Sequence, residues 1–399
     1  MPTNTAAWLG AKGARLAVGP APYTPPREGE IVVKNHAVAI NPLDWIIQVA
    51  GSVAYRWLRY PCVLGADLAG EVVEVGAGVT RFTVGDRVLG HAVGTDKDRN
   101  TPAEGAFQEY TVLLAHMAAP IPDTMPYESA AVLPLALSTA ACGLFQRDQL
   151  ALHYPAATPQ PTGQTLLVWG GATSVGSNAI QLAVAAGYAV VTTASPRNFD
   201  YVRELGASQV FDRRSTTVVR EIIAAFAGKT LAGALAIGAG SAEPCADIVR
   251  ACHGTRRIAI ASTPVSFASG LTFQTFRKLI SSTVALQVRC RIRRIRTTFI
   301  VGTTLKANEV GGDDLRGVPA RGPRGGALCG RAGTLRHRHG TQARPGRVRH
   351  ATGRGLRREG GRLLMMRVLG AVCRHIASIA ALENREAVSA ATHGGQRSI

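Results

Sequence analysis

The C-terminal part of this 399-residue sequence lacks aromatic side chains. Residues 311–399 contain no Phe, Tyr, Trp or Lys, but they contain 17 Arg and only 5 acidic residues. Aromatic side chains supply much of the area that a core buries, so this stretch has little from which to build one. Its charge of +12 makes up most of the formal net charge of +19, because the other 310 residues carry 28 basic and 21 acidic residues.

The sequence also lacks paired cysteines. Its seven Cys form an odd, scattered set with no Cys-x-x-Cys, which favours a reducing, cytoplasmic setting over a disulfide framework. They are Cys62, Cys142, Cys245, Cys252, Cys290, Cys329 and Cys373. The N-terminus has no apolar run long enough for a signal peptide, and no run of about 20 apolar residues predicts a membrane span.

What the sequence does contain suffices for about two domains, since 46% of its residues are hydrophobic. In the first 150 residues, β-rich runs at 31–40, 63–76 and 105–113 alternate with Gly-containing turns. Many short strands of this kind predict a compact β-barrel-like unit. A helical pattern then runs from about Ser129 to Phe145, with a kink expected at Pro134.

A glycine-rich turn follows the apolar run 165–169 and precedes a helical pattern that ends at Gly187, after which a second strand runs over 188–193. Such a βαβ unit brings the turn and the helix N-terminus to a pyrophosphate, and the positive end of the helix dipole favours the negative charge. The predicted cofactor-binding residues of this turn are Gly170, Gly171, Ala172, Thr173, Ser174 and Val175.

The residues after the second strand predict which dinucleotide is bound. NAD sites usually place an acidic residue there, against the ribose 2′-hydroxyl. This sequence has Ser195, Arg197 and Asn198, which carry donors for a phosphate and no carboxylate to repel it. The pattern favours NADPH; the alternative is a plain polar loop with a solvated Arg. Strand and helix patterns continue to alternate as far as residue 262, which predicts a doubly wound parallel sheet.

Together these segments resemble the medium-chain dehydrogenase/reductase superfamily, in its zinc-independent enoyl reductase and quinone oxidoreductase branch. The similarity spans about residues 5–310 and is carried by VLGADLAGEVVEVG, FTVGDRV, GAFQEY, AAVLPLALSTA, LLVWGGATSVGSNAIQLA and TTASPRN, in that order. The WGGATSVGSNAIQ and SPRN segments are especially similar to stand-alone enoyl reductases related to trans-acting polyketide partners. The resemblance implies an α/β fold with a GroES-like β-barrel catalytic domain and a Rossmann domain, which binds NADPH between the two domains.

The implied domain boundaries are a catalytic domain over 1–130, a Rossmann domain over 131–290 and the start of a return segment over 291–311. Residues 312–399 would be an irregular, disordered Arg/Gly-rich tail.

The family motifs also imply roles for individual residues. Asp44 and Trp45 would contact the cofactor, and so would Gly302 and Thr303 in a turn over the nicotinamide, while Thr139 is the candidate catalytic donor. The equally open alternative is that Ser138 and Thr139 only cap or line a helix. The implied substrate-side residues are Leu133, Pro134 and Ser138. Two positions depart from the family: Ile46 replaces a frequent Lys, and Arg213 replaces a Tyr that packs on the adenosine.

We expect no metal. The zinc-dependent branch has Cys near Pro42, Gly-His-Glu where this chain has Gly65-Ala66-Asp67, and a lobe of four close cysteines that is missing here. His91 and His116 are isolated and read as ordinary polar positions rather than as ligands.

The expected function is NADPH-dependent, metal-independent reduction of the C=C bond of an enoyl thioester or a related activated alkene. The alternatives are a quinone oxidoreductase, an inactive cofactor-binding product of a frameshifted gene, and a nucleic-acid binder that acts through the basic tail. We expect a small-molecule or acyl-thioester substrate, with an acyl carrier protein as a further candidate partner. A monomer or homodimer is expected, with neither a nucleic-acid nor a membrane partner.

The sequence changes character at Gly311, after VGTTLKANEVG. One permissible set of codons for residues 310–335 reads VGAMIYVEFLPAALAEGRYAAAPEP when one G is removed. That peptide regains the missing aromatic and acidic residues and resembles the expected family ending. We therefore hypothesise a single-base frameshift. Residues 311–364 would then be translated in the wrong reading frame, and residues 365–399 would be translated from DNA downstream of the gene's own stop codon.

A second basic run, VRCRIRRIR over 288–296, precedes that change. It is read as a solvated helix face, or alternatively as a site for an acidic carrier protein or for the phosphates of CoA.

Overall fold

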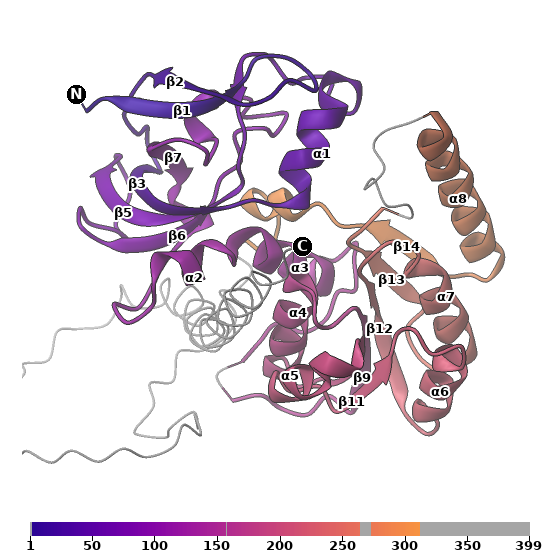
Figure 1. Ribbon diagram of the computed structural model, residues 1–399. Helices are drawn as coiled ribbons and strands as arrows, with labels where there is room; N and C mark the ends of the chain where they lie inside the picture. The colour runs from indigo at the N-terminus through magenta and orange to yellow at the C-terminus, as the bar shows by residue number, and fades with distance from the viewer. Residues whose placement is uncertain (1, 157, 264–272, 312–399) are drawn as a thin grey trace, which may run out of the picture.

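The computed structural model describes residues 2–156, 158–263 and 273–311, which form two units joined along one boundary (Figure 1). The prediction of an irregular tail over 312–399 lies outside the described residues.

The first unit contains two antiparallel sheets, which confirms the predicted β-rich unit. The five-stranded sheet has the order β7-β3-β5-β6-β8, and the three-stranded sheet has the order β2-β1-β4. Every second residue of a strand faces the same side of its sheet. Such residues of β3, β5 and β6 face one side of the five-stranded sheet and form the core of this unit. The strands are β1 (Asn4–Leu9), β2 (Ala17–Ala21), β3 (Glu30–Ala39), β4 (Cys62–Val63), β5 (Asp67–Val75), β6 (Arg87–His91), β7 (Tyr110–Leu114) and β8 (Ala118–Pro120).

Short helices connect these strands. Helix α1 (Pro42–Ala50) was not expected from the sequence; it is separated from β3 by two residues and begins with Pro at its first position, where a missing N–H costs nothing. Three single-turn 3-10 helices complete the unit: η1 (Gly51–Val53), η2 (Pro102–Glu104) and η3 (Ala115–Met117).

The predicted kinked helix from Ser129 to Phe145 is two helices, α2 (Tyr127–Ala131) and α3 (Pro134–Phe145). Proline lacks the N–H that a continuous helix needs, so the chain breaks before Pro134 and α3 starts there. The stretch Tyr127–Phe145 is long and apolar enough to cross a membrane, but 72% of it is buried inside the protein. Its apolar character is that of a core segment, because α3 packs against both units (Figure 1).

The second unit is a parallel six-stranded sheet in the order β11-β10-β9-β12-β13-β14. Numbered within this unit, the strands lie in the order 3-2-1-4-5-6, which is the doubly wound order of a Rossmann fold. The strands are β9 (Gln164–Trp169), β10 (Ala189–Ala194), β11 (Gln209–Asp212), β12 (Thr230–Ala236), β13 (Arg257–Ile260) and β14 (Arg296–Phe299).

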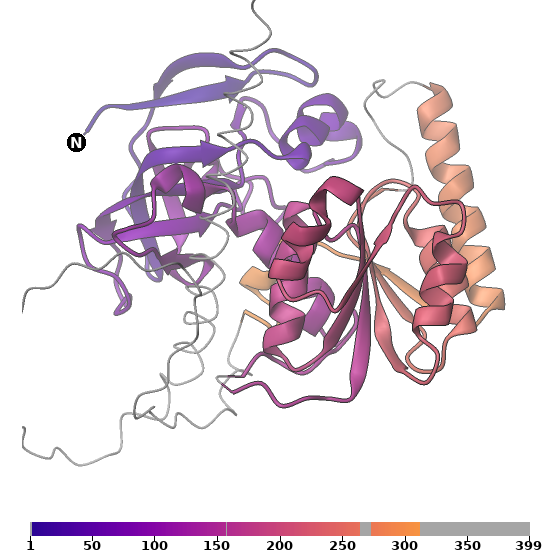
Figure 2. The same cartoon turned by 60° about the horizontal axis from the view of Figure 1, so that its bottom comes forward.

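Helices cover both faces of this sheet. Figure 2 shows it nearly edge-on, with α4 and α5 on one side and α6, α7 and α8 on the other. The helices are α4 (Ser174–Ala185), η4 (Pro196–Asn198), α5 (Phe199–Glu204), α6 (Val218–Ala225), α7 (Ala242–Ala251) and α8 (Phe273–Ile292). These elements confirm the predicted doubly wound α/β architecture.

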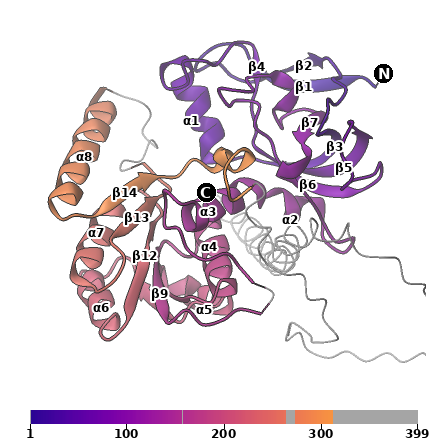
Figure 3. The same ribbon diagram turned by 180° about the vertical axis from the view of Figure 1, so that it is seen from behind.

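The chain returns toward the first unit after β14, through η5 (Gly302–Lys306). Figure 3 shows this orange coil beside α3, between the two units. Lys306 Nζ pairs with the carboxylates of Asp96 and Asp98 of the first unit, and Lys306 O accepts a hydrogen bond from His116 Nε2 at 2.8 Å. Because all six strands are parallel, their carboxyl ends face this boundary, where α/β proteins bind ligands.

Candidate functional site: the carboxyl edge of the parallel sheet

The glycine-rich turn joins β9 to α4 at the predicted place, and its glycines are closely packed. Gly170 has φ of 92°, a conformation that favours glycine. A Cβ on Gly171 would lie 2.2 Å from Thr192 Oγ1, and a Cβ on Gly176 would lie 2.2 Å from Gly170 O. Larger residues would therefore displace either the turn or α4, so these glycines set how closely the backbone approaches a ligand.

The N-terminus of α4 faces outward from this turn. Thr173 caps the helix, since its hydroxyl accepts a hydrogen bond from Gly176 N at 3.0 Å and donates one to Gly170 O at 2.8 Å. The first amides of a helix have no intrahelical partner, which leaves those of Ser174 and Val175 for a ligand. Thr173 and Ser174 are exposed, so a pyrophosphate has access to this end of the helix.

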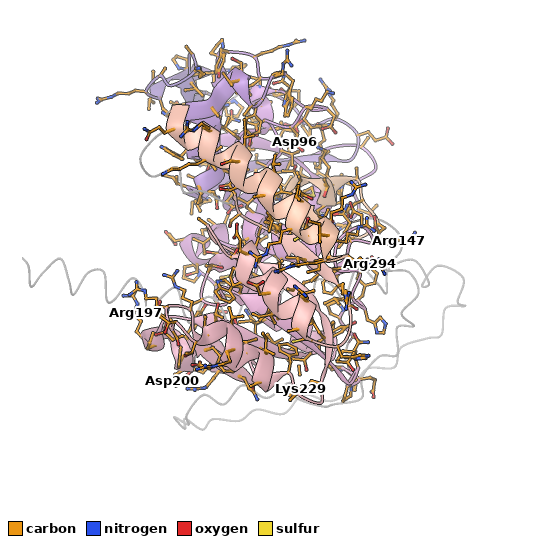
Figure 4. All side chains as sticks on the ribbon, turned by 90° about the vertical axis from the view of Figure 1, so that its right-hand side faces the viewer. Asp96, Arg147, Arg197, Asp200, Lys229 and Arg294 are labelled. Atoms are coloured by element: carbon orange, nitrogen blue, oxygen red, sulfur yellow. The ribbon has the colours of Figure 1, made fainter. Side chains whose placement is uncertain are left out.

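Polar and basic side chains lie at the ends of β10 and β11. Ser195, Arg197 and Asn198 follow β10, and Figure 4 shows Arg197 at the surface of the second unit. The parallel pairing of Ala194 with Asp212 brings Arg213 beside this loop, and Arg213 N donates to Ala194 O at 3.2 Å. Two acidic residues lie nearby: Asp200 pairs with Arg203 at 3.0 Å, and the carboxylate of Asp212 accepts a hydrogen bond from Arg214 N at 3.0 Å.

The predicted nicotinamide turn is docked on α3. A Cβ on Gly302 would lie 2.6 Å from Thr139 Oγ1, so η5 and α3 touch at these two residues. Thr139 is half-buried, and its hydroxyl donates to Leu135 O at 2.7 Å. Thr303 is half-buried in the same turn. The structure thus brings Thr139, Gly302 and Thr303 together from positions more than 160 residues apart.

Further contacts between α3 and the residues around η5 hold this turn in place. Asn308 Nδ2 lies 3.4 Å from Cys142 Sγ and 3.3 Å from Thr304 Oγ1. Burial raises the pKa of the Cys142 thiol, so it remains a neutral packing group. Just after the end of α3, Arg147 N donates a hydrogen bond to the Glu309 carboxylate at 2.7 Å.

A buried carboxyl group links the first unit to α3. Asp67 Oδ1 accepts the amide of Leu135 at 2.6 Å, and Asp67 Oδ2 accepts a hydrogen bond from Asn41 Nδ2 at 3.0 Å. Only 1% of Asp67 is exposed, and burial raises its pKa from 3.8 to about 7. Because Asp67 caps the first turn of α3, it fixes where Thr139 lies.

His91 is paired opposite Asp67 across β5 and β6. Its Nδ1 lies 3.0 Å from Ser138 Oγ, while its Nε2 has no hydrogen-bond partner among the described residues. Burial lowers the pKa of His91 to about 4, with a further contribution from the charge of Lys306, so the ring is neutral at pH 7. Sequence reasoning treated His91 as an isolated polar residue and did not predict its contact with Ser138.

The predicted substrate-side residues are more deeply buried than residues that touch a substrate directly would be. Leu133 is 1% exposed, Ser138 is 5% exposed and bonded to His91, and Pro134 is buried at the start of α3. These three residues pack beneath the site. Their contact with substrate stays a prediction.

The two predicted cofactor residues of α1 differ in exposure. Asp44 is 5% exposed, and its carboxylate accepts hydrogen bonds from Asn41 N at 2.8 Å and Gly65 N at 3.2 Å. Burial raises its pKa to about 6. Trp45 is 37% exposed on the same helix. Asp44 therefore fixes the start of α1, and any effect that it has on a cofactor acts through the position of that helix.

No group of three or more His, Cys, Asp or Glu side chains in the described residues could hold a metal ion. A surface depression of about 400 Å³ is present elsewhere, lined by Phe226, Lys229, Thr230, Cys252 and His253. It lies at the start of β12, the opposite edge of the sheet from the glycine-rich turn, and so is not part of this site.

The fold and this edge define the class of the protein. Residues 27–123 match the alcohol dehydrogenase GroES-like domain, and the chain belongs to the medium-chain dehydrogenase/reductase superfamily. It is an oxidoreductase of that superfamily, whose members typically bind a nicotinamide cofactor.

Particular relatives are similar over most of the described chain. Dehydrogenase pigH of Monascus ruber is 54% identical over 316 residues, covering 78% of this chain and 86% of the relative. Trans-enoyl reductase himH of Aspergillus japonicus is 47% identical over 220 residues, covering 55% of this chain and 62% of the relative. A solved alcohol dehydrogenase superfamily protein from Novosphingobium aromaticivorans has a TM-score of 0.58 and 26% identity, covering 77% of this chain and 82% of that protein.

Proposed function

We propose that this chain is an NADPH-dependent, metal-independent reductase of the C=C bond in an enoyl thioester or a related activated alkene. The observation that carries the proposal is the site at the carboxyl edge, where the glycine-rich turn and the Thr139–Gly302 contact face the same boundary. The similarity to a protein named a trans-enoyl reductase supports the choice of substrate class.

The residues present fit a dinucleotide. Gly170, Gly171 and the amides of Ser174 and Val175 would hold the pyrophosphate, because no Cβ obstructs the turn and the helix dipole favours the charge. Ser195, Arg197 and Asn198 would bind the phosphate on the adenosine ribose, and Arg213 lies close enough to add a second cation. This donor set supports NADPH over NADH.

When bound, NADPH supplies a hydride to the β-carbon of the alkene. Negative charge then develops on the carbonyl oxygen of the substrate, where a hydrogen-bond donor stabilises it. Thr139 is the proposed donor, and to act it must exchange its bond to Leu135 O for one to the substrate. Solvent is the proposed source of the proton for the α-carbon.

Residues 1–130 and 131–290 are the proposed domains, with the return segment starting at 291. We also propose that residues after Gly311 are out of frame. Similarity to the Monascus relative spans 78% of 399 residues, which is about 311 residues. That number is close to the length of chain before the change in composition, which supports this proposal. Genomic sequencing tests it: an unchanged G-run with no sensible alternative frame would exclude a frameshift.

The compartment is proposed to be cytoplasmic, since the five described cysteines are all free. NADPH oxidation by the full chain with crotonyl-CoA, crotonyl-pantetheine and a quinone, each repeated with NADH, tests the activity. We expect turnover of the two crotonyl thioesters with NADPH. Turnover of the quinone alone, or a preference for NADH, would contradict the proposal; a chain that binds NADPH and reduces nothing would be the inactive cofactor-binding product.

A further inference from the structure

An apolar stripe runs along the outer face of α8. Ile280, Val284, Val288 and Ile292 recur every fourth residue, so they lie on one side of the helix. Their exposed fractions are 50%, 55%, 52% and 78%. Figure 4 shows α8 across the face turned toward the viewer, with Arg294 just beyond its C-terminal end.

The fold does not need this stripe for its own core. The opposite side of α8 already packs inward through Leu286 and Cys290, which are 6% and 1% exposed and belong to the core formed with α7. Arg289 and Arg293 also bind the Asp247 carboxylate of α7, each at 2.6 Å. The helix is therefore anchored on one side and offers a second apolar side to solvent.

The segment that carries the stripe has charge of one sign. Residues 273–296 contain seven Arg or Lys residues and no Asp or Glu, and two of the seven, Arg289 and Arg293, are paired with Asp247 of α7. At 100° per residue, Arg277 and Arg291 fall on the same side of the helix as the stripe, and both are exposed. A second copy of this surface would bring these cations together, which disfavours self-association through α8.

We propose that the outer face of α8 is a docking surface for an acyl carrier protein, which presents an apolar helix face bordered by carboxylates. This partner rests on the proposed function, because an enoyl thioester is carried either on CoA or on the pantetheine arm of such a protein. Apolar contact through Val284 and Val288 gives affinity, and Arg277 and Arg291 select the acidic partner. The surface lies beside β14, the strand that leads to Gly302 and the site.

Binding of a fluorescently labelled carrier domain from a fungal polyketide synthase to the full chain tests this inference without requiring turnover. We expect Val284→Glu and Arg291→Glu each to weaken the Kd by about tenfold, and the wild-type Kd to weaken with added salt. The matched charge reversal Arg220→Glu, at an exposed position of α6, should leave the Kd unchanged. NADPH affinity should stay the same in all three variants, which shows that each is folded.

Other outcomes would overturn the inference. These are the absence of carrier binding by a chain that binds NADPH, equal loss in the Arg220→Glu control, and a dimer by light scattering that Val284→Glu converts to a monomer. The last outcome would make α8 an interface between copies of the chain. Failure of the proposed function is separate, because it appears as an absence of crotonyl-pantetheine reduction while carrier binding is measured independently.

Discussion

The carboxylate of Asp67 on β5 accepts the backbone amide of Leu135 on α3 at a distance of 2.6 Å. This contact spans 68 residues and connects the first unit to the helix that carries Thr139. Asn41 binds the second carboxylate oxygen, so both oxygens of a fully buried group are used for positioning.

Asp67→Asn should change how stability depends on pH. Burial raises the pKa of Asp67 from 3.8 to about 7 on folding, so the folded state binds the proton more tightly. The Asp67 contribution to the free energy of unfolding is therefore full below about pH 4 and is lost as the pH rises to about 7. At 1.36 kcal/mol per pH unit the loss is roughly 4 kcal/mol, and an uncharged Asn does not undergo it.

The comparison with wild type isolates this effect. His91 acts in the opposite direction, because its lowered pKa means that its contribution is lost as the pH falls from 6.5 to about 4. Asp44 acts in the same direction as Asp67, because burial raises its pKa to about 6. Taking the difference between Asp67→Asn and wild type subtracts the contributions that His91 and Asp44 make in both proteins. Denaturant unfolding at pH 5 and pH 8 should show Asp67→Asn gaining stability relative to wild type at the higher pH. A difference that does not vary with pH would contradict the assignment.

Gly302→Ala should destabilise the return segment. The added Cβ would lie 2.6 Å from Thr139 Oγ1 and 3.2 Å from Thr139 N, so η5 must move away from α3. We expect a loss of about 1–3 kcal/mol in the free energy of unfolding, as for overpacking. Gly10→Ala is the matched control, because nothing lies within 4 Å of a Cβ there. Adding Thr139→Ala should recover part of the loss, and no recovery would place the clash elsewhere.

Arg197→Ala should weaken NADPH binding selectively. Removing a charge-assisted hydrogen bond to phosphate costs about 1.5–3 kcal/mol, which is roughly a tenfold or larger increase in Kd. NADH carries no phosphate there, so its Kd should be unchanged. Titration with both cofactors measures the ratio of the NADPH Kd to the NADH Kd, and Arg220→Ala, at an exposed position, is the control. An equal loss for NADPH and NADH would show that Arg197 does not read the phosphate.

Thr173→Ala should loosen the start of α4. The Thr173 hydroxyl bonds Gly176 N and Gly170 O, and loss of such a cap typically costs about 1 kcal/mol. Thr173→Ser keeps the hydroxyl and should behave like wild type in thermal unfolding. If Ala and Ser lower the unfolding temperature equally, the hydroxyl bonds are not what stabilises this turn.

Local patterns made the second unit predictable. Most strands there are short apolar runs ended by Gly or a polar loop, and residues 165–176 alone predict the glycine-rich turn. The exception is β14, whose sequence RTTF carries no apolar run and which the pattern did not predict. The break at Pro134 was predicted as a kink because proline acts locally, although it divides the helix completely.

Long-range contacts were not predictable in this way. Nothing in the spacing of Asp67 and His91 shows that they meet α3 at Leu135 and Ser138, or that Asn41 binds Asp67. The one local signal was a charged Asp67 inside the otherwise apolar run VLGADLAG, which requires a partner when it is buried. Helix α1 was also missed, because its start after Asn41-Pro42 was interpreted only as the end of a strand.

The most direct measurement is transfer of deuterium from reduced, deuterium-labelled NADPH to crotonyl-pantetheine, using the full chain alongside the frame-restored chain. The account predicts a butyryl product that carries one deuterium at its β-carbon, formed at least by the frame-restored chain. A folded, NADPH-binding protein that leaves the alkene intact in both forms, or that transfers deuterium only to a quinone, would contradict it.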